Sequence, residues 1–218
     1  MFLSDRDLRW AIESGRLIID PRPSKIEPTS IDLHLDSIKE AKIWDLHAIS
    51  ENNLIHGLKP KEVMIGRFDF RKFSAKYLVS LPQEAEKDEN QLVFRRGEQV
   101  VIKPQGFLLW QTKEKIGTPD DRADLICFIE GKSTRARTGI LIHMTAPTIH
   151  STWIGNVTLE IANLGPFIFV LEENDVIAQL TVATISSPPV ESMKAGVTYA
   201  QKEVGSSGQL NKKRDRRR

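Results

Sequence analysis

A short basic stretch rich in hydroxyl groups, EGKSTRARTGILIHMTA at residues 130–146, holds the first side chains that could do chemistry. In a single helical turn, Ser133 and Arg137 would lie four residues apart and share a face. The backbone N–H groups of such a turn, together with Lys132, Arg135 and Arg137, could hold a phosphate group. A solvated charged loop has the same composition. The stretch alone therefore fits either an anion site or an ordinary surface turn.

A second candidate is Glu160, in the stretch GNVTLEIANLG at residues 155–165. Alternation along a strand would place Leu159 on one face and Thr158 and Glu160 on the other. The apolar neighbours predict a partly buried carboxyl group with a raised pKa, able to take up and release protons near neutral pH. On the strand pattern alone, a structural ion pair on an exposed sheet face is the simpler interpretation.

The histidines and the single cysteine do not indicate a zinc centre. His143 lies in LIHMTA, where alternation leaves its face undecided. The other histidines show neither H-x-x-x-H nor H-E-x-x-H spacing. One cysteine, Cys127, provides neither a disulfide within the chain nor the several thiolates of many zinc sites. We therefore expect no metal site made by the protein itself.

The composition is that of an ordinary globular protein. The chain has 218 residues, of which 40% are hydrophobic and 28% charged, and its formal net charge is +2. This near balance does not indicate a nucleic-acid partner, and the basic end NKKRDRRR is expected to be solvated. No signal-peptide core and no apolar run of membrane-spanning length is present. We expect a cytoplasmic protein with no membrane association.

The elements that must position these residues are mainly strands. A helix is predicted within residues 3–17, where Ser4 and Asp7 form a start signal and Gly15 a stop signal. Residues 36–90 give no clear pattern. Strand-length runs follow at residues 91–94, 99–102, 106–112, 124–130, 139–149, 156–164, 167–171 and 176–185. Many short strands with little helix between them predict an all-β sandwich or barrel.

With these residues assembled, the chain resembles the dCTP deaminases of the trimeric dUTPase-like superfamily. GKSTRARTGILIHMTA is similar to the family's G-R-S-S-x-A-R-x-G followed by H-x-T-A, and GNVTLEIAN to its G-x-(I/V)-x-L-E-x-x-N, at the family's spacing. The likeness runs from LSDRDLRWAIESGRLIIDP to VIAQLTV. It implies an all-β, jelly-roll-like fold or distorted barrel over residues 1–190, with an N-terminal helix. It also implies a homotrimer with active sites between subunits that deaminates dCTP to dUTP and ammonia.

The resemblance implies roles for individual residues. Glu160 would be the proton shuttle, Ser133 would place the attacking water and the base, and Arg137 would steady the charge of Glu160. Positions that match substrate contacts are Lys132, Ser133, Thr134, Arg135, Ala136 and Arg137 around the phosphates, and Thr145, Thr158, Leu159 and Glu160 near the cytosine. His143 falls in the segment that the family uses for regulation, with dTTP as the inhibitor. Mg²⁺ would ride on the triphosphate. The zinc-dependent route needs more cysteines than this chain has.

The chain departs from the family pattern at three places. Lys132 stands where the family usually has arginine, so a bidentate phosphate contact is replaced by a point charge. His150 stands where an aspartate normally contacts the deoxyribose hydroxyl, which leaves the choice between dCTP and CTP open. Residues 191–218 would form a phosphate-covering segment and then a basic tail. Its candidate ligands are Tyr199, Lys202 and Gln209.

Three other functions remain open. A dUTPase uses an aspartate in place of His150 to orient water, so His150 counts against that activity. A bifunctional enzyme would carry dCTP directly to dUMP. A nucleotide-binding trimer without turnover is the third alternative.

Overall fold

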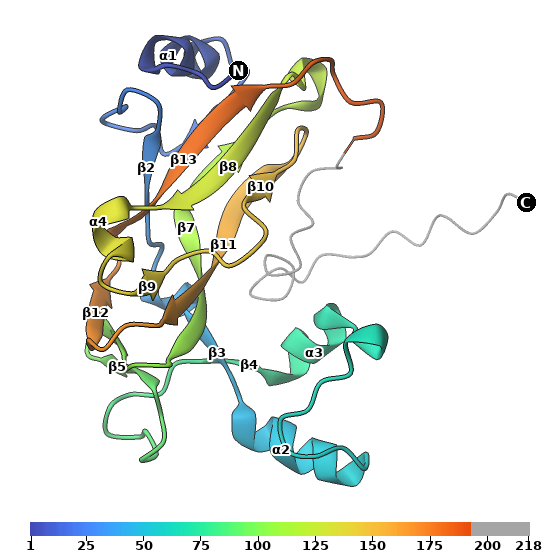
Figure 1. Ribbon diagram of the computed structural model, residues 1–218, viewed down its shortest axis with the longest axis vertical. Helices are drawn as coiled ribbons and strands as arrows, with labels where there is room; N and C mark the ends of the chain where they lie inside the picture. Colours follow the sequence, from blue (N-terminus) through green and yellow to red (C-terminus); the bar gives the residue numbers. More distant parts are fainter. Residues whose placement is uncertain (193–218) are drawn as a thin grey trace, which may run out of the picture.

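The computed structural model describes residues 1–192, and strands dominate it (Figure 1). The helices are α1 (Asp5–Glu13), α2 (Leu46–Ile55), α3 (Phe70–Tyr77) and α4 (Ser133–Ala136), with 3-10 turns η1 (Ile38–Glu40), η2 (Ile65–Arg67) and η3 (Asp120–Arg122). The strands are β1 (Ile18–Asp20), β2 (Ile31–His34), β3 (Lys42–Trp44), β4 (Leu78–Ser80), β5 (Val93–Arg96), β6 (Gln99–Ile102), β7 (Phe107–Gly117), β8 (Leu125–Gly131), β9 (Ile140–Leu141), β10 (Thr148–Ile149), β11 (Ile154–Asn163), β12 (Phe169–Glu172) and β13 (Val176–Thr184).

Within these residues the strands form three antiparallel sheets. The largest has the order β4-β3-β7-β11-β9, with β1 also paired to β7. A second sheet has the order β10-β8-β13-β2, and a third the order β12-β6-β5. The prediction of an all-β fold with few short helices is confirmed. No helix in this part of the chain is long and apolar enough to cross a bilayer.

One hydrophobic core joins the sheets. Leu33 of β2, Ile102 of β6, Leu125 of β8 and Leu159 of β11 are all fully buried in the same cluster. Trp110 of β7 is also buried there, and its indole N–H donates a hydrogen bond of 3.1 Å to the carbonyl of Ser37. Burial of apolar side chains, at roughly 25 cal/mol per Å², is the main force that holds the sheets together.

Helix α1 matches its sequence signals. The carboxylate of Asp7 accepts hydrogen bonds from both the hydroxyl (2.9 Å) and the backbone N–H (3.4 Å) of Ser4. Leu8 and Ala11 are fully buried on one face of the helix. Gly15 has a φ of +72°, a backbone conformation that glycine adopts at little cost and that ends helices. The predicted helix is therefore confirmed.

The segment that gave no clear pattern contains two helices, α2 and α3. Asp45 caps α2 by accepting the N–H of Ala48 at 2.9 Å, and Asp69 caps α3 by accepting the N–H of Lys72 at 3.2 Å. Figure 1 shows the two helices together at one end of the molecule, with α1 at the other end. We refer to residues 45–77 as the helical unit.

The predicted strand at residues 139–149 is wrong. The structure has two strands of two residues each, β9 and β10, separated by a loop. Pro147 has no N–H for a ladder, and the ring of His143 binds the carbonyl of Ala146 at 2.6 Å. The backbone therefore turns away from the sheet, and this loop carries His143 to β11.

Candidate active site

The pairing of β11 with β7 sets the direction of the Glu160 side chain. The register of this ladder shifts between Asn156 and Thr158. At the shift, the N–H of Val157 donates a hydrogen bond of 2.9 Å to the hydroxyl of Thr112 instead of to a backbone carbonyl. Such irregularities re-aim the side chains that follow. Beyond it, Thr158 and Glu160 lie half-buried on one face, as the alternation predicted.

Glu160 is hydrogen-bonded to His143. The Nδ1 atom of His143 lies 2.6 Å from Oε2 of Glu160, and the N–H of Met144 donates to the same oxygen at 3.4 Å. The second ring nitrogen of His143, Nε2, lies 2.6 Å from the carbonyl oxygen of Ala146. The His143 side chain is only 8% exposed and that of Glu160 31%. The carboxylate of Glu160 is therefore partly accessible to a substrate, while the ring of His143 is held in place by its contact with Ala146.

The two contacts of His143 fix where its protons are. A carbonyl oxygen only accepts, so Nε2 must carry a hydrogen to bond with Ala146. One further proton then lies between Nδ1 of His143 and the carboxyl group of Glu160. The pair is either imidazolium with carboxylate or neutral imidazole with carboxylic acid, and it exchanges these forms by moving one proton along a single hydrogen bond.

The charges favour the ionised form of this pair. Burial pushes the pKa of Glu160 upward, but the hydrogen bond and charge of His143 and the N–H of Met144 outweigh it, so that this pKa lies below its ordinary value. The hydrogen bond to Glu160 raises the pKa of His143 despite the opposing effect of burial. The raised pKa predicted for Glu160 from its apolar neighbours is therefore wrong in direction, because the sequence did not show that His143 lies beside it.

The basic turn forms α4, as the spacing predicted. The guanidinium Nη2 of Arg137 donates a hydrogen bond of 3.2 Å to the hydroxyl of Ser133, so the two side chains do share a face. Gly139 leaves the turn with a φ of +94°, and a Cβ there would lie 2.4 Å from the Cα of Gly165. This close approach of two backbones holds α4 against the connection between β11 and β12.

The side chains around α4 differ in availability. Ser133, Thr134, Ala136 and Arg137 are exposed, whereas Lys132 and Arg135 are half-buried. The ammonium group of Lys132 forms an ion pair with the carboxylate of Asp32 on β2, with both side chains about a quarter exposed. A phosphate would have to compete with Asp32 for this lysine, so the turn offers less free positive charge than its sequence suggests.

The remaining predicted residues are placed as follows. Leu159 is fully buried in the core, so it can meet a substrate only through its backbone. The hydroxyl of Thr158 is buried and has no hydrogen-bond partner within residues 1–192. Thr145 and His150 are exposed. Tyr199, Lys202 and Gln209 lie outside the described residues.

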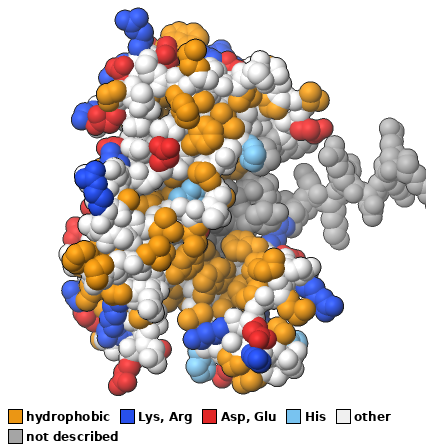
Figure 2. Space-filling view, viewed as in Figure 1, with side chains coloured by type: hydrophobic (Ala, Val, Ile, Leu, Met, Phe, Trp, Pro, Cys, Tyr) orange, Lys and Arg blue, Asp and Glu red, His pale blue; other side chains and the backbone are white. Residues whose placement is uncertain are grey.

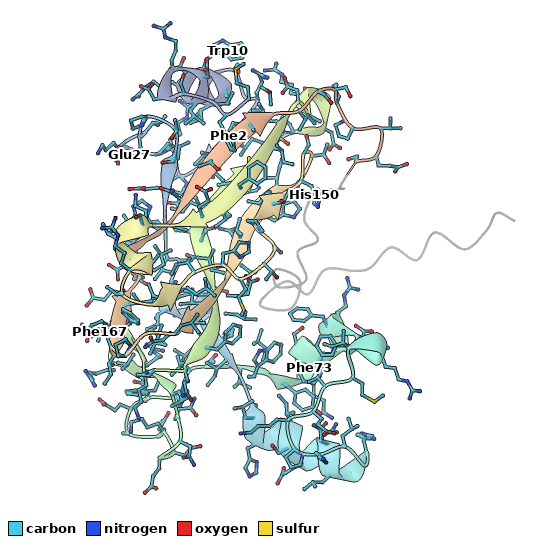
Figure 3. The ribbon with its side chains drawn as sticks, viewed as in Figure 1. Phe2, Trp10, Glu27, Phe73, His150 and Phe167 are labelled. Carbon is cyan, nitrogen blue, oxygen red and sulfur yellow. The ribbon has the colours of Figure 1, made fainter. Side chains whose placement is uncertain are left out.

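Within one chain the predicted catalytic residues form two separate clusters. Glu160 pairs with His143, and Arg137 pairs with Ser133. No hydrogen bond or ion pair among residues 1–192 joins one cluster to the other, so the contact expected between Arg137 and Glu160 is not made inside this chain. Figures 1 and 3 also place His150, beyond the end of β10, on the side of the molecule away from α4. A single chain therefore does not assemble the whole set.

Metal ligands do not gather at either cluster. Across residues 1–192, no three side chains of histidine, cysteine, aspartate or glutamate converge as a metal site would require. The thiol of Cys127 is buried, and burial raises its pKa to about 12. The expectation of zinc-free chemistry stays a prediction, for which a chelator titration is the direct test.

Known proteins share both the motif blocks and the fold. The family model described as "dCTP deaminase-like" matches residues 2–185. The chain belongs to this family. Relatives named "dCTP deaminase, dUMP-forming" include one from Methanosphaera stadtmanae, 32% identical over 189 residues, which covers 85% of this chain and 80% of the relative. Another, from Mycolicibacterium vanbaalenii, is 32% identical over 205 residues, and the match covers 91% of this chain and 90% of the relative.

A solved structure supports the fold assignment of this dCTP deaminase-like chain. The 2'-deoxycytidine 5'-triphosphate deaminase of Agrobacterium tumefaciens superposes with a TM-score of 0.53 at 18% identity. The match covers 83% of this chain and 47% of the other, so the chain spans about half of that protein. The predicted fold class is confirmed.

Sequence reasoning missed two pairings in this dCTP deaminase-like site. It expected a cation beside Glu160 without identifying His143 as one, and it left Lys132 free instead of paired with Asp32. The available signal was a histidine and a glutamate in consecutive apolar segments joined by a short loop. Alternation along a strand could not show that the loop after β9, which carries His143, folds back over β11.

Proposed function

We propose that this protein deaminates dCTP by hydrolysis and carries the product on to dUMP. Family membership supports the deamination, and the names of the relatives support dUMP as the end product. The dUTP end product expected from the sequence therefore gives way to the bifunctional alternative. The observation that carries the proposal is the hydrogen bond between Glu160, half-buried on β11, and His143, on the loop after β9.

Deamination needs a group that both accepts and returns protons. As water attacks C4 of cytosine, the ionised Glu160 takes one of its protons and delivers it to N3. The same carboxyl group then moves the remaining hydroxyl proton to the amino group, the C4–N bond breaks, and ammonia leaves. A well-placed acid and base of this kind contributes about 10²–10⁴-fold to the rate. The imidazolium of His143 keeps Glu160 ionised, and so ready to accept the first proton.

We propose a homotrimer in which Ser133 and Arg137 of one subunit meet Glu160 of the next. The separation of the two clusters within one chain supports this arrangement, because each cluster alone lacks a catalytic part. The surface next to α4 supports it as well. Leu164, Phe167 and Ile168 are each more than half exposed there, and Figure 3 shows Phe167 on the same side of the molecule as α4. Apolar side chains that stay exposed in one chain are typical of an interface.

For the triphosphate, we propose that the substrate is the Mg²⁺ complex of dCTP. The exposed Arg137 and Thr134 are the groups on α4 most available to phosphate oxygens, and an arginine can contact two of them at once. Lys132 would also contact the phosphate oxygens once its ion pair with Asp32 is broken. Thr158 would edge the cytosine, since it lies half-buried on the same face of β11 as Glu160. dTTP would act as an inhibitor. Its triphosphate would compete for the same phosphate contacts, and its base would lie at the segment that contains His143 and Thr145.

One assay tests this proposal. Ammonia release is measured with dCTP, CTP, dCMP and dUTP, and the nucleotide products are separated by chromatography. We expect ammonia from dCTP together with dUMP and pyrophosphate. Accumulation of dUTP would limit the protein to deamination. dUMP from dUTP without ammonia from dCTP would make it a dUTPase, and tight dCTP binding without any product would make it a binding protein.

A further inference from the structure

The helical unit contains a hollow that the proposed reaction does not use. It has a volume of about 390 Å³, within the range of roughly 300–1,000 Å³ of pockets that hold small ligands. It lies between α2, η2 and α3, and Glu160 and Ser133 are not among its lining residues. Figure 1 shows the two helices grouped apart from α4.

One wall of this hollow is aromatic. The ring of Phe73 lies 5.0 Å from that of Phe68 and 4.8 Å from that of Tyr77, centroid to centroid. Behind it, Trp44 of β3 contacts Phe73 at 5.4 Å. Figure 3 labels Phe73 on α3. Phe68 and Phe73 are only half-buried, so a planar ring could extend this cluster by stacking or edge contacts.

The rim of the hollow is cationic. Arg67 is exposed and lies on the lining of the hollow. Lys72 is exposed and only 3.5 Å from Asp69, a surface contact that water screens. The lining carboxylate of Glu62 accepts the backbone N–H of Lys59 at 3.0 Å. Blue Lys and Arg side chains border the helical unit in Figure 2.

A buried hydroxyl without a partner also belongs to this wall. Tyr77 is 4% exposed, and its OH group has no hydrogen-bond partner in the described part of the chain. An unsatisfied buried hydroxyl of this kind costs free energy in the folded chain. The amide of Asn52, which accepts from Lys76 at 3.0 Å, is a second polar group on the same lining.

We propose that this hollow is a second binding site, for a nucleoside monophosphate. The base would pack against Phe68 and Phe73, and the phosphate would lie between Arg67 and Lys72. Charge favours this ligand over a neutral aromatic molecule, and the aromatic wall favours it over a bare phosphate. The site does not depend on the deamination chemistry.

Calorimetry with adenosine monophosphate tests the site, because a purine is a poor fit to a pyrimidine pocket. We expect one molecule to bind per chain, in the wild type and in Glu160→Gln alike. Arg67→Ala and Lys72→Ala should each weaken binding about tenfold, as loss of one charged hydrogen bond does. Lys59→Ala, which removes an exposed cation of the same unit outside the hollow, should leave affinity unchanged.

Further measurements separate the ligand's parts and guard against misfolding. Tyr77→Phe should change neither binding nor Tm, since its hydroxyl is buried and has no partner to lose. Adenosine and inorganic phosphate should each bind at least tenfold more weakly than the monophosphate. Ammonia release from dCTP should survive Arg67→Ala. The proposal is overturned if no monophosphate binds, if all variants bind equally, or if adenosine or phosphate alone binds as tightly.

Discussion

Replacing His143 by alanine should shift the pH dependence of ammonia release. In the wild type, His143 holds the pKa of Glu160 below its ordinary 4.5 against the effect of burial. The variant keeps the burial and the N–H of Met144 but loses the ring hydrogen bond of 2.6 Å and its charge. A hydrogen bond to a charged group is worth about 1.5–3 kcal/mol. Because Glu160 is nearly one third exposed, we take the lower half of that range.

Loss of that free energy, about 1.5–2.2 kcal/mol, raises the pKa of Glu160 in the variant. The acidic limb of kcat/KM for dCTP should move to higher pH, by about one pH unit for each 1.4 kcal/mol lost, since the reacting form is the carboxylate. His47→Ala is the matched control, because His47 is 84% exposed on α2 and bonded to nothing at the site. An acidic limb that stays in place, or that moves to lower pH, would refute the assigned charge state.

The same substitution has a signed effect on stability. Glu160 has a lowered pKa, so its contribution is complete above pH 4.5 and is lost as the pH falls through its folded value. His143 has a raised pKa, so its contribution is complete below pH 6.5 and is lost as the pH rises through its folded value. The loss of Tm in His143→Ala should therefore be largest between pH 4.5 and 6.5. A loss that is larger at pH 9 would contradict the ion pair.

Three further predictions concern the assembly, the products and the fold. The variants Arg137→Ala and Glu160→Gln should each have lost nearly all activity. If one subunit completes the site of the next, refolding the two variants together should restore part of the ammonia release. No recovery would place both groups in one chain. His150→Asp, which restores the carboxylate of the family pattern, should raise the rate of dUMP formation from dUTP, as chromatography would reveal; an unchanged rate removes position 150 from phosphate cleavage. Gly139→Ala should cost at least about 2 kcal/mol of folding free energy, because its φ is positive and its Cβ would meet Gly165. Calorimetric unfolding should then show a Tm lower by about 4–8 °C.

The β part of the fold was predictable because its strands are local patterns. Alternation along β11 correctly placed Leu159 in the core and Glu160 on the other face. The helical unit was missed although Asp45 and Asp69 are ordinary helix caps. The apolar residues of α2 do not form one face, so that helix has no periodic stripe to find.

The site was predictable in its residues but less so in its contacts. Spacing along the chain was enough to pair Ser133 with Arg137, because four residues make one helical turn. The contact of His143 with Glu160 depends on a loop that leaves the sheet after β9, which no local pattern encodes. The ion pair of Lys132 with Asp32 joins residues 100 positions apart, so it too required the folded chain.

The most direct test of the account is the rate of ammonia release from dCTP by Glu160→Gln, measured beside calorimetric binding of dCTP. The amide keeps nearly the same volume but cannot accept the proton of water. We predict turnover lower by about 10²–10⁴-fold with binding retained. Turnover within a few-fold of the wild type would show that Glu160 does not move the protons of this reaction.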